Sequence, residues 1–396
     1  MMLILRMMMK KKKLSNRFYF FMKHFFLFCM LLLSVGAFAD QKPVNEKKTS
    51  TKDSSNTYSI TYDSPFLKHC DSVCASNMQL NNEPKPWLSY YDFGSDSIPN
   101  YLDTTYRERI TYMDTQSPFS FRYNEDVRKM IYFYAERRPG MISRALATKD
   151  LYFPLFEEML DKYQLPVELK YLAIVESALN PRAKSRAGAM GLWQFMPATG
   201  RLYGLHSNSR IDDRMNPYKA TEAACQHFVD LYEIYQDWNL VLAAYNAGPG
   251  NVNKAIRRAG GPTDYWSIRQ YLPRETRAYV PAFIAINYFM KYADAHNIEA
   301  RQQPSMSYFQ TDTVYVRNEI SFNQLSDWLD VDVSLLEKLN PQYRRNYIPA
   351  ATTKSHVLTL PLEKIGAFIL NENLIFSGIS KEEFSRKWPQ SENPLQ

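Results

Sequence analysis

The stretch from residue 165 to 197 (LPVELKYLAIVESALNPRAKSRAGAMGLWQFMP) constrains the fold most, because it places a carboxylate on an apolar helix face. Pro166 suits the first turn of a helix, and Pro181 cannot continue one. Three leucines between these ends recur at steps of four and three residues and share one face: Leu165, Leu169 and Leu172. The next position on that face is Glu176. The pattern therefore predicts an inward-facing carboxyl group.

Burial disfavours the charged form of a carboxyl group, so the pKa of Glu176 should be raised. A carboxyl group that stays protonated near neutral pH is what general acid catalysis requires. Two structural alternatives remain open at this point. Glu176 could be neutralised by an arginine, or it could sit at the helix edge and reach water.

The segment that follows this helix combines flexible backbone with large side chains. Gly188 and Gly191 allow positive φ angles and close backbone approach. Gln194 then lies among the large apolar side chains of Trp193, Phe195 and Met196. An amide among apolar groups suits a sugar-binding surface, where ring faces pack and amides bind hydroxyls. The alternative is a tight turn followed by an ordinary amphipathic helix.

Residues 123–300 show helical periodicity without strand-like alternation, which predicts an all-α domain. A turn at residues 137–140 ends the first helix, and Gly-Pro clusters at 248–250 and 260–262 end two later ones. The expected later helices cover residues 141–147, 154–163, 218–235, 239–246, 251–258 and 272–295, the last broken or kinked at Pro281.

A small α+β unit is expected after a polar linker at residues 301–312. Strand patterns at 313–316 and 355–360 flank helices at 321–329 and 334–339. Ser321 and Gln324 form a capping box at the start of the first of these helices. The unit is expected to span residues 313–364, with a peripheral tail at 365–396.

The first 39 residues have the features of a cleavable export signal. They hold seven basic residues and no acidic one, an apolar run at 25–33, and the sequence Ala-Phe-Ala at 37–39. An uncleaved membrane anchor is the alternative, although the run is short for a span of about 20 residues. Residues 40–122 are expected to contain a linker and a region without an assignable fold.

The positive charge of the chain belongs to this leader. The whole sequence has 48 Lys and Arg against 41 Asp and Glu, and the part after residue 39 has 41 of each. The basic balance is therefore no indication of nucleic-acid binding, and no nucleic-acid partner is expected.

The cysteine pattern favours no metal or cofactor. Cys70 and Cys74 are four residues apart and could pair in an oxidising compartment, although a disulfide between successive helical turns needs distorted geometry. Adding His69 gives only three candidate metal ligands, which is weak support for a site. Cys225 lies in an apolar helical stretch and is expected to be a buried thiol.

Four motifs occur in order along the helical region. They are Glu176-Ser177, GLWQFMP at 191–197, AYNAGPG at 244–250 and ETRAYVP at 275–281. Together they resemble the soluble-lytic-transglycosylase family of lysozyme-like enzymes, in particular the membrane-bound transglycosylase D type. The C-terminal unit resembles a LysM domain, a peptidoglycan-binding module. It departs from the LysM pattern at residues 317–319, where Arg-Asn-Glu replaces the usual Gly-Asp.

The resemblance implies non-hydrolytic cleavage of the β-1,4 bond between N-acetylmuramic acid and N-acetylglucosamine, leaving 1,6-anhydromuramic ends. Glu176 would be the single general acid and base. Tyr245 would point at this carboxyl, and Asn246 would brace its turn. Other matched positions would contact substrate: Ser185, Gln194, Met196, Glu275 and, more weakly, Tyr279. For Ser177, helix packing is as good an explanation as function, and Trp193 is expected to pack.

The resemblance also implies an exported enzyme of the periplasm or cell envelope that acts as a monomer on glycan strands, with possible membrane association. Two alternatives stay open. A hydrolytic muramidase would add Glu275 or Asp212 as a second carboxylate. A non-catalytic wall-binding protein would keep the fold without the reaction.

Overall fold

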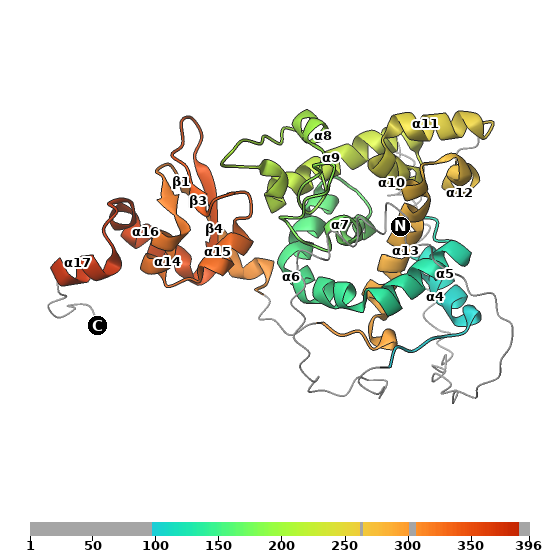
Figure 1. Cartoon of the computed structure of the whole chain (residues 1–396), viewed down its shortest axis with the longest axis horizontal. Helices are drawn as coiled ribbons and strands as arrows, with labels where there is room; N and C mark the ends of the chain where they lie inside the picture. The colour runs from blue at the N-terminus through green and yellow to red at the C-terminus, as the bar shows by residue number, and fades with distance from the viewer. Residues whose placement is uncertain (1–96, 262–263, 301–305, 388–396) are drawn as a thin grey trace, which may run out of the picture. The chain divides into compact units, whose positions relative to one another are not determined.

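The computed structural model describes residues 97–261, 264–300 and 306–387, which contain two hydrophobic cores (Figure 1). The larger core lies mainly within a helical domain, with Leu339 of the C-terminal part buried in it, and the smaller core lies mainly within an α+β domain at the C-terminal end. This confirms the expected mainly helical fold with a small α+β C-terminal domain.

The helical domain is built around α13 (Arg274–Tyr292), which contacts helices from across the domain: α4 (Asp103–Thr115), α5 (Glu125–Tyr132), α6 (Pro139–Lys162), α7 (Leu172–Ser177) and α10 (Trp238–Ala247). Twelve of its residues are buried, from Thr276 to Phe289. The remaining helices are α8 (Pro197–Leu202), α9 (Pro217–Tyr235), α11 (Pro249–Arg258) and α12 (Tyr265–Ile268).

Two prolines lie inside continuous helices. The sequence predicted a break or kink at Pro281 and the start of a separate helix at Pro154. α13 runs through Pro281 without a break, and α6 runs through Pro154, so the two separate helices expected at 141–147 and 154–163 are wrong. A proline removes one backbone hydrogen bond and crowds the preceding turn, at a cost of about 3 kcal/mol. Burial of large side chains on both sides of Pro154, such as Phe153 and Phe156, offsets that cost in α6.

Helix α4 was missed, because it falls in the region that had no assignable fold. Tyr106 and Ile110 on this helix are buried in the larger core. Arg109 donates a hydrogen bond of 2.8 Å to the hydroxyl of Tyr288 on α13. Residues 103–115 therefore belong to the helical domain rather than to a linker. The low apolar periodicity of α4 explains why its sequence gave no clear helical signal.

The C-terminal domain has two antiparallel strand pairs and three packed helices. β1 (Thr311–Val316) pairs with β4 (His356–Pro361), and β2 (Ile320–Ser321) pairs with β3 (Tyr347–Ile348). Two helices lie between the strands in sequence, α14 (Phe322–Leu329) and α15 (Val333–Leu339). The capping box of Ser321 and Gln324 is present as predicted.

The expected peripheral tail from residue 365 is instead part of the domain. α16 (Leu362–Phe376) buries Phe368 and Ile375 in the smaller core, and a short helix, α17 (Lys381–Lys387), follows. α16 packs against the β1–β4 pair, since it contacts both strands, and it also contacts α14.

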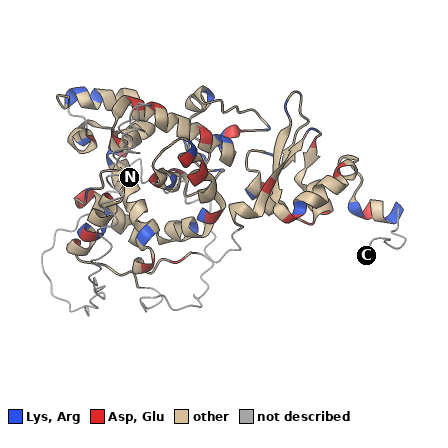
Figure 2. Ribbon diagram, turned by 180° about the vertical axis from the view of Figure 1, so that it is seen from behind, with Lys and Arg blue, Asp and Glu red and all other residues tan. Residues whose placement is uncertain are grey.

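Within the described ranges, no helix is long and apolar enough to cross a membrane. The expected export signal, Cys70 and Cys74 lie outside the described residues. Figure 2 shows Lys and Arg interspersed with Asp and Glu along the described helices.

Candidate active site

Glu176 lies near the end of a much shorter helix than the sequence predicted. Residues Val167–Tyr171 form a 3-10 helix, and α7 continues only from Leu172 to Ser177. Ala178 and Leu179 then adopt positive φ angles of 51° and 59°, which end the helix. Leu169 and Leu172 are fully buried as expected. The side chain of Glu176 is 8% exposed, so the predicted inward-facing carboxyl group is present.

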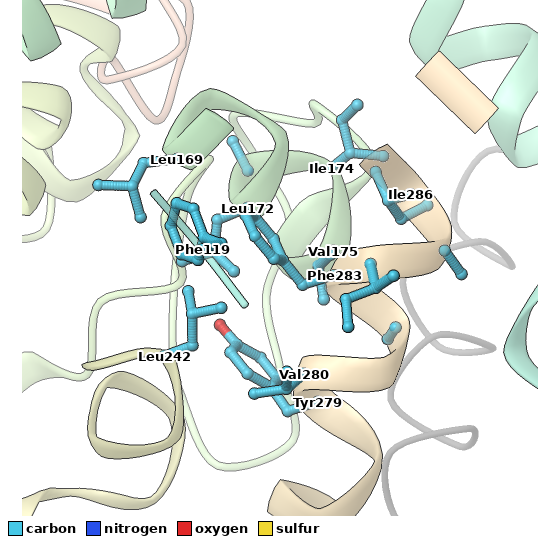
Figure 3. Packing of buried hydrophobic residues seen from close by; sticks show 14 of the residues in the cluster. Phe119, Leu169, Leu172, Ile174, Val175, Leu242, Tyr279, Val280, Phe283 and Ile286 are labelled. Atoms are coloured by element: carbon cyan, nitrogen blue, oxygen red, sulfur yellow. The ribbon is translucent and has the colours of Figure 1, made fainter. Parts of the chain in front are cut away.

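The hydroxyl of Tyr279 donates a short hydrogen bond to Oε1 of Glu176. Tyr279 extends from α13 into the buried cluster that contains Leu169 and Leu172 (Figure 3). Burial raises the pKa of Glu176 to about 8, against the lowering effect of the Tyr279 hydrogen bond; the nearby Glu275 adds to the rise. The carboxyl group is therefore protonated near neutral pH.

Tyr245 lies close enough to Glu176 for the carboxyl group, after burial, to raise the pKa of the Tyr245 hydroxyl, but the hydrogen bond of that hydroxyl goes elsewhere. Its hydroxyl donates to the backbone carbonyl of Trp193 at 2.8 Å, and its ring stacks on Phe228 with a centroid separation of 4.9 Å. Tyr279, expected only as a weaker cleft-lining residue, is the tyrosine that bonds to Glu176. The sequence could not separate these two tyrosines, because each lies in a matching motif on a different helix.

The loop at residues 183–196 folds back on itself through short backbone bridges. Met190 and Phe195 exchange two hydrogen bonds of 3.1 Å, and Gly191 donates to Ala183 at 2.9 Å. The Ser185 hydroxyl accepts from the backbone of Ala189 at 2.9 Å. This hydrogen bond helps to hold the turn, and the half-buried Ser185 hydroxyl stays a predicted substrate contact.

Gly191 is required at its position in this loop. Its φ angle is 88°, and a Cβ atom there would lie 1.9 Å from the carbonyl oxygen of Arg214. Only glycine allows this approach of the two backbones.

Gln194 has a buried hydrogen-bond acceptor that the loop does not use. Its Nε2 donates to the carbonyls of Ala183 and Gly191 at 3.1 and 2.9 Å. Its Oε1 is buried without a hydrogen-bond partner among the described residues. Such an acceptor is costly unless a ligand or water satisfies it. Met196, two residues later, is 41% exposed and can contact a ligand.

The remaining residues from the motifs divide into supporting and packing roles. Asn246 accepts a hydrogen bond of 2.8 Å from Thr276, so it fastens α10 to α13. Glu275, beside Thr276, is half-buried and acts electrostatically on Glu176. Ser177 is fully buried and donates to the carbonyls of Ala173 and Leu192, which supports the packing interpretation. Trp193 is also fully buried, and its indole nitrogen donates to Thr221.

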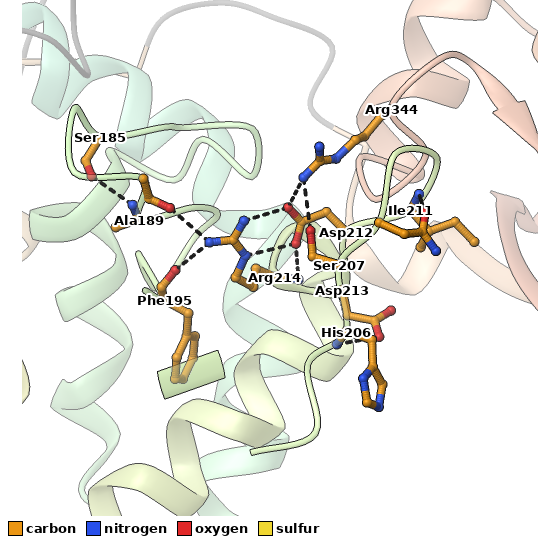
Figure 4. A network of polar contacts seen from close by, with 12 residues as sticks. Ser185, Ala189, Phe195, His206, Ser207, Ile211, Asp212, Asp213, Arg214 and Arg344 are labelled. Carbon is orange, nitrogen blue, oxygen red and sulfur yellow. Dashed lines mark hydrogen bonds and ion pairs between the residues drawn. The ribbon is translucent and has the colours of Figure 1, made fainter. Parts of the chain in front are cut away.

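Asp212, the other carboxylate considered for catalysis, is held by two arginines (Figure 4). It is fully buried, and it accepts hydrogen bonds from Arg214 at 2.8 and 3.0 Å and from Arg344 at 2.5 Å. Burial alone would raise the pKa of Asp212, but the two arginines outweigh it and lower the pKa below its usual range. The sequence analysis did not identify Arg214 as a partner of Asp212. The one local indication was that an arginine follows this aspartate by two residues.

No group of three or more metal-ligating side chains occurs in the part of the chain that the structure describes. Cys225 is buried as a free thiol, and burial raises its pKa to about 12. The thiol is thus protonated and suits a packing role.

Two protein families match separate parts of the chain. Residues 154–267 match the family described as transglycosylase SLT domain. Residues 310–376 match the family described as the LysM-like domain of lytic transglycosylase MltD. The second match includes α16, in agreement with its place in the smaller core.

Among curated proteins, the membrane-bound lytic murein transglycosylase D of Escherichia coli K12 is 36% identical over 183 residues, covering 45% of this chain and 40% of that protein. The soluble lytic murein transglycosylase of the same organism is 28% identical over 152 residues, covering 35% of this chain and 24% of that protein. The chain thus matches less than half of the length of these relatives.

Among solved structures, the 70 kDa soluble lytic transglycosylase of Escherichia coli is 27% identical, with a TM-score of 0.31, covering 38% of this chain and 26% of that one. The two family matches and the curated relatives agree with each other. The chain is a lytic murein transglycosylase homologue with an SLT domain followed by an MltD-type LysM-like domain.

Proposed function

We propose that this protein cleaves peptidoglycan glycan strands as a lytic transglycosylase, with Glu176 as its general acid and base. The observation that carries this proposal is the buried carboxyl group of Glu176, whose pKa is raised to about 8 and whose Oε1 accepts the Tyr279 hydroxyl. A group in this state can donate a proton at neutral pH, as acid catalysis requires. The similarity to lytic murein transglycosylases supplies the substrate class.

The reaction needs one carboxyl group in two steps. Glu176 first gives its proton to the oxygen between C1 of N-acetylmuramic acid and the following N-acetylglucosamine, and that C1–O bond breaks. The ionised Glu176 then takes the proton of the C6 hydroxyl of the same muramic acid, as O6 bonds to C1. An intramolecular hydroxyl has a high effective concentration, so water is not consumed.

The loop at residues 183–196 supplies the substrate contacts in this proposal. The unpartnered Oε1 of Gln194 accepts a hydrogen bond from a sugar hydroxyl or acetamide group, and exposed Met196 packs on a sugar ring. Ser185 keeps the turn of the loop. Tyr279 orients the carboxyl group of Glu176 and stabilises it when it is ionised.

Hydrolysis is the second candidate, and Glu275 is the observation that favours it. A hydrolytic glycosidase uses two carboxyl groups, one of which acts on water or on the sugar. Glu275 is close enough to raise the pKa of Glu176. Asp212 does not fill this role, because both its oxygens accept hydrogen bonds from arginine.

The chain is further proposed to act in the cell envelope. A relative at 36% identity is named as membrane-bound, and the LysM-like domain match indicates contact with peptidoglycan. Glycan strands are then the partner of both domains. The proposed catalytic unit is a monomer.

Mass spectrometry of the fragments released from purified peptidoglycan tests the proposal. Fragments with 1,6-anhydromuramic ends are expected. Reducing ends, heavier by one water, would replace this mechanism with hydrolysis through Glu275. The Glu176→Gln variant is the control, since any release it retains would come from another group or a contaminant. No release by the unaltered protein would contradict catalysis altogether.

A further inference from the structure

A buried ion-pair network joins the proposed substrate loop to the C-terminal domain (Figure 4). Its centre is the carboxylate of Asp212, which is fully buried. Arg214 donates to one oxygen from Nε at 3.0 Å and to the other from Nη2 at 2.8 Å. This two-point arrangement fixes the plane of the Arg214 guanidinium group.

The third nitrogen of Arg214 points at the substrate loop. Nη1 donates to the carbonyl of Gly188 at 2.9 Å and to the carbonyl of Phe195 at 3.1 Å. These carbonyls lie at opposite ends of the loop segment that contains Gln194, so one guanidinium group sets the distance between them. Arg214 is only 6% exposed, so the loss of Asp212 would leave a buried charge without compensation.

The C-terminal domain supplies the second cation of this network. Nη2 of Arg344 donates to Oδ2 of Asp212 at 2.5 Å and to the Ser207 hydroxyl at 3.1 Å. The backbones of the same segments also pair, because Arg344 donates to Arg210 at 2.9 Å and Asp212 donates to Gln342 at 3.0 Å. Arg344 is therefore placed by its backbone as well as by its side chain.

Next to this network the two domains are separated by a cavity of about 600 Å³. Its polar lining comes from both sides, including His206 and Lys219 on one side and Lys354 and His356 on the other. Apolar contacts also join the two parts, since Leu339 is buried in the larger core and Ile211 packs against the smaller one. The Asp212 network and its backbone pairs are the polar coupling that continues to the substrate loop. The side chain of Arg344 is 35% exposed. Because its partner Asp212 is fully buried, this ion pair should contribute more than a pair between two exposed side chains.

We propose that the C-terminal domain positions the substrate loop, and that Arg344 does so by fixing Asp212, which in turn fixes Arg214 and the carbonyls of Gly188 and Phe195. Asp212, Arg214 and Arg344 are positioning residues that act through the loop. The C-terminal domain would then affect the cleavage of a short soluble glycan through the substrate loop, without binding that glycan itself. The kinetic part of this inference depends on the proposed function; the loop-ordering part does not.

Hydrogen exchange of the full-length protein tests the loop-ordering part. In the Arg344→Gln variant, the backbone amides of residues 189–195 should exchange at least about threefold faster. Their hydrogen bonds form only while Arg214 holds the loop closed, and Arg344 helps to fix Arg214 through Asp212. The matched control is Arg345→Gln, which removes the same charge from the exposed neighbouring residue. Unchanged exchange in Arg344→Gln, or equal acceleration in the control, would overturn the proposal.

Kinetics on a short soluble glycan tests the consequence for the site. Arg344→Gln should raise KM by about threefold or more with a smaller effect on kcat, because Gln194 is displaced while Glu176 and Tyr279 lie on other elements. Arg344→Lys should recover part of the loss, since it keeps the charge. An unchanged KM in Arg344→Gln would refute the positioning role. If neither this variant nor the unaltered protein cleaves, the proposed function fails, and the exchange experiment still decides the loop coupling.

Discussion

Glu176 and Asp212 are both buried carboxyl groups of the helical domain, yet their surroundings favour opposite charge states. The exposed fractions of the two side chains are 8% and 0%. Burial raises the pKa of Glu176 to about 8, and its partners include a phenol and a second carboxyl group. At Asp212 burial acts in the same direction, but two guanidinium groups reverse it.

The comparison shows that burial disfavours the ionised form of both carboxyl groups. Whether a buried carboxyl group is nevertheless ionised depends on its neighbours, and at Asp212 these are cationic. A protonated Glu176 can give a proton to a substrate. An ionised Asp212 cannot give one, and its oxygens are occupied by Arg214 and Arg344. One carboxyl group is therefore suited to chemistry and the other to holding structure.

The largest expected effect follows from removing the acid. Glu176→Gln should lower the rate of anhydromuramic product formation by about 10³-fold or more, because the amide has no proton to give. Glu275→Gln is the comparison, and it should keep most of the activity if a single acid suffices. Product release by quantitative mass spectrometry measures both. Equal losses in the two variants would indicate that the reaction needs both carboxyl groups.

The same substitution should not weaken folding, and its effect on stability should depend on pH. The folded-state pKa of Glu176 is raised, so its contribution to stability is present in acid and is lost as pH rises towards about 8. Glu176→Gln should therefore be more stable relative to the unaltered protein at pH 8 than at pH 4. Thermal unfolding at the two pH values measures this difference.

Asp212→Asn should have the opposite profile, with a loss of stability of about 2 to 4 kcal/mol at neutral pH, because it leaves buried Arg214 without its charge partner. The folded-state pKa of Asp212 is lowered, so its stabilisation is present above the unfolded-state pKa and is lost as pH falls through the folded-state value. Urea unfolding across acidic pH measures this. A loss that does not diminish in acid would mean that hydrogen-bond geometry, and not charge, holds the network.

The sequence predicted the inward position of Glu176, but it could not predict the partners of this carboxyl group. Periodicity reports which side of a helix is buried, and Leu169 and Leu172 fixed that side. The identity of the bonded tyrosine depends on how α10 and α13 cross near α7, which is long-range packing. Tyr245 and Tyr279 are separated from Glu176 by many residues, so no local pattern distinguishes them.

The limits of the fold prediction have related causes. Pro154 and Pro281 carry strong local signals against a continuous helix, and tertiary burial overrode both. The sequences of α4 and α16 lack clear apolar periodicity. These helices are stabilised by the burial of a few side chains in the two cores, such as Ile110 and Phe368. The link from Asp212 to Arg344 spans 132 residues and joins two domains, which a single sequence does not reveal.

A smaller effect is expected from Tyr279→Phe, which removes the hydroxyl that bonds to Glu176. That hydrogen bond lowers the pKa of Glu176, so its loss should raise the pKa further and move the alkaline decline of activity to higher pH. The rate at pH 6 should fall by about tenfold, because the carboxyl group loses its orienting donor. The pH profile of kcat/KM measures both changes. If the alkaline decline of kcat/KM stays at the same pH in Tyr279→Phe, Tyr279 does not influence the pKa of the catalytic acid.

The smallest effect is expected from Tyr245→Phe, the matched control for Tyr279. Its hydroxyl donates to the carbonyl of Trp193, so its removal should cost about 1 kcal/mol of unfolding free energy, as for one buried hydrogen bond. The ring would keep its stacking on Phe228, and the alkaline limb should stay where it is in the unaltered protein. If Tyr245→Phe shifts the limb and Tyr279→Phe does not, the roles of the two tyrosines are reversed. The hydroxyl of Tyr245, which already interacts electrostatically with Glu176, would then be the one that acts on the carboxyl group during the reaction.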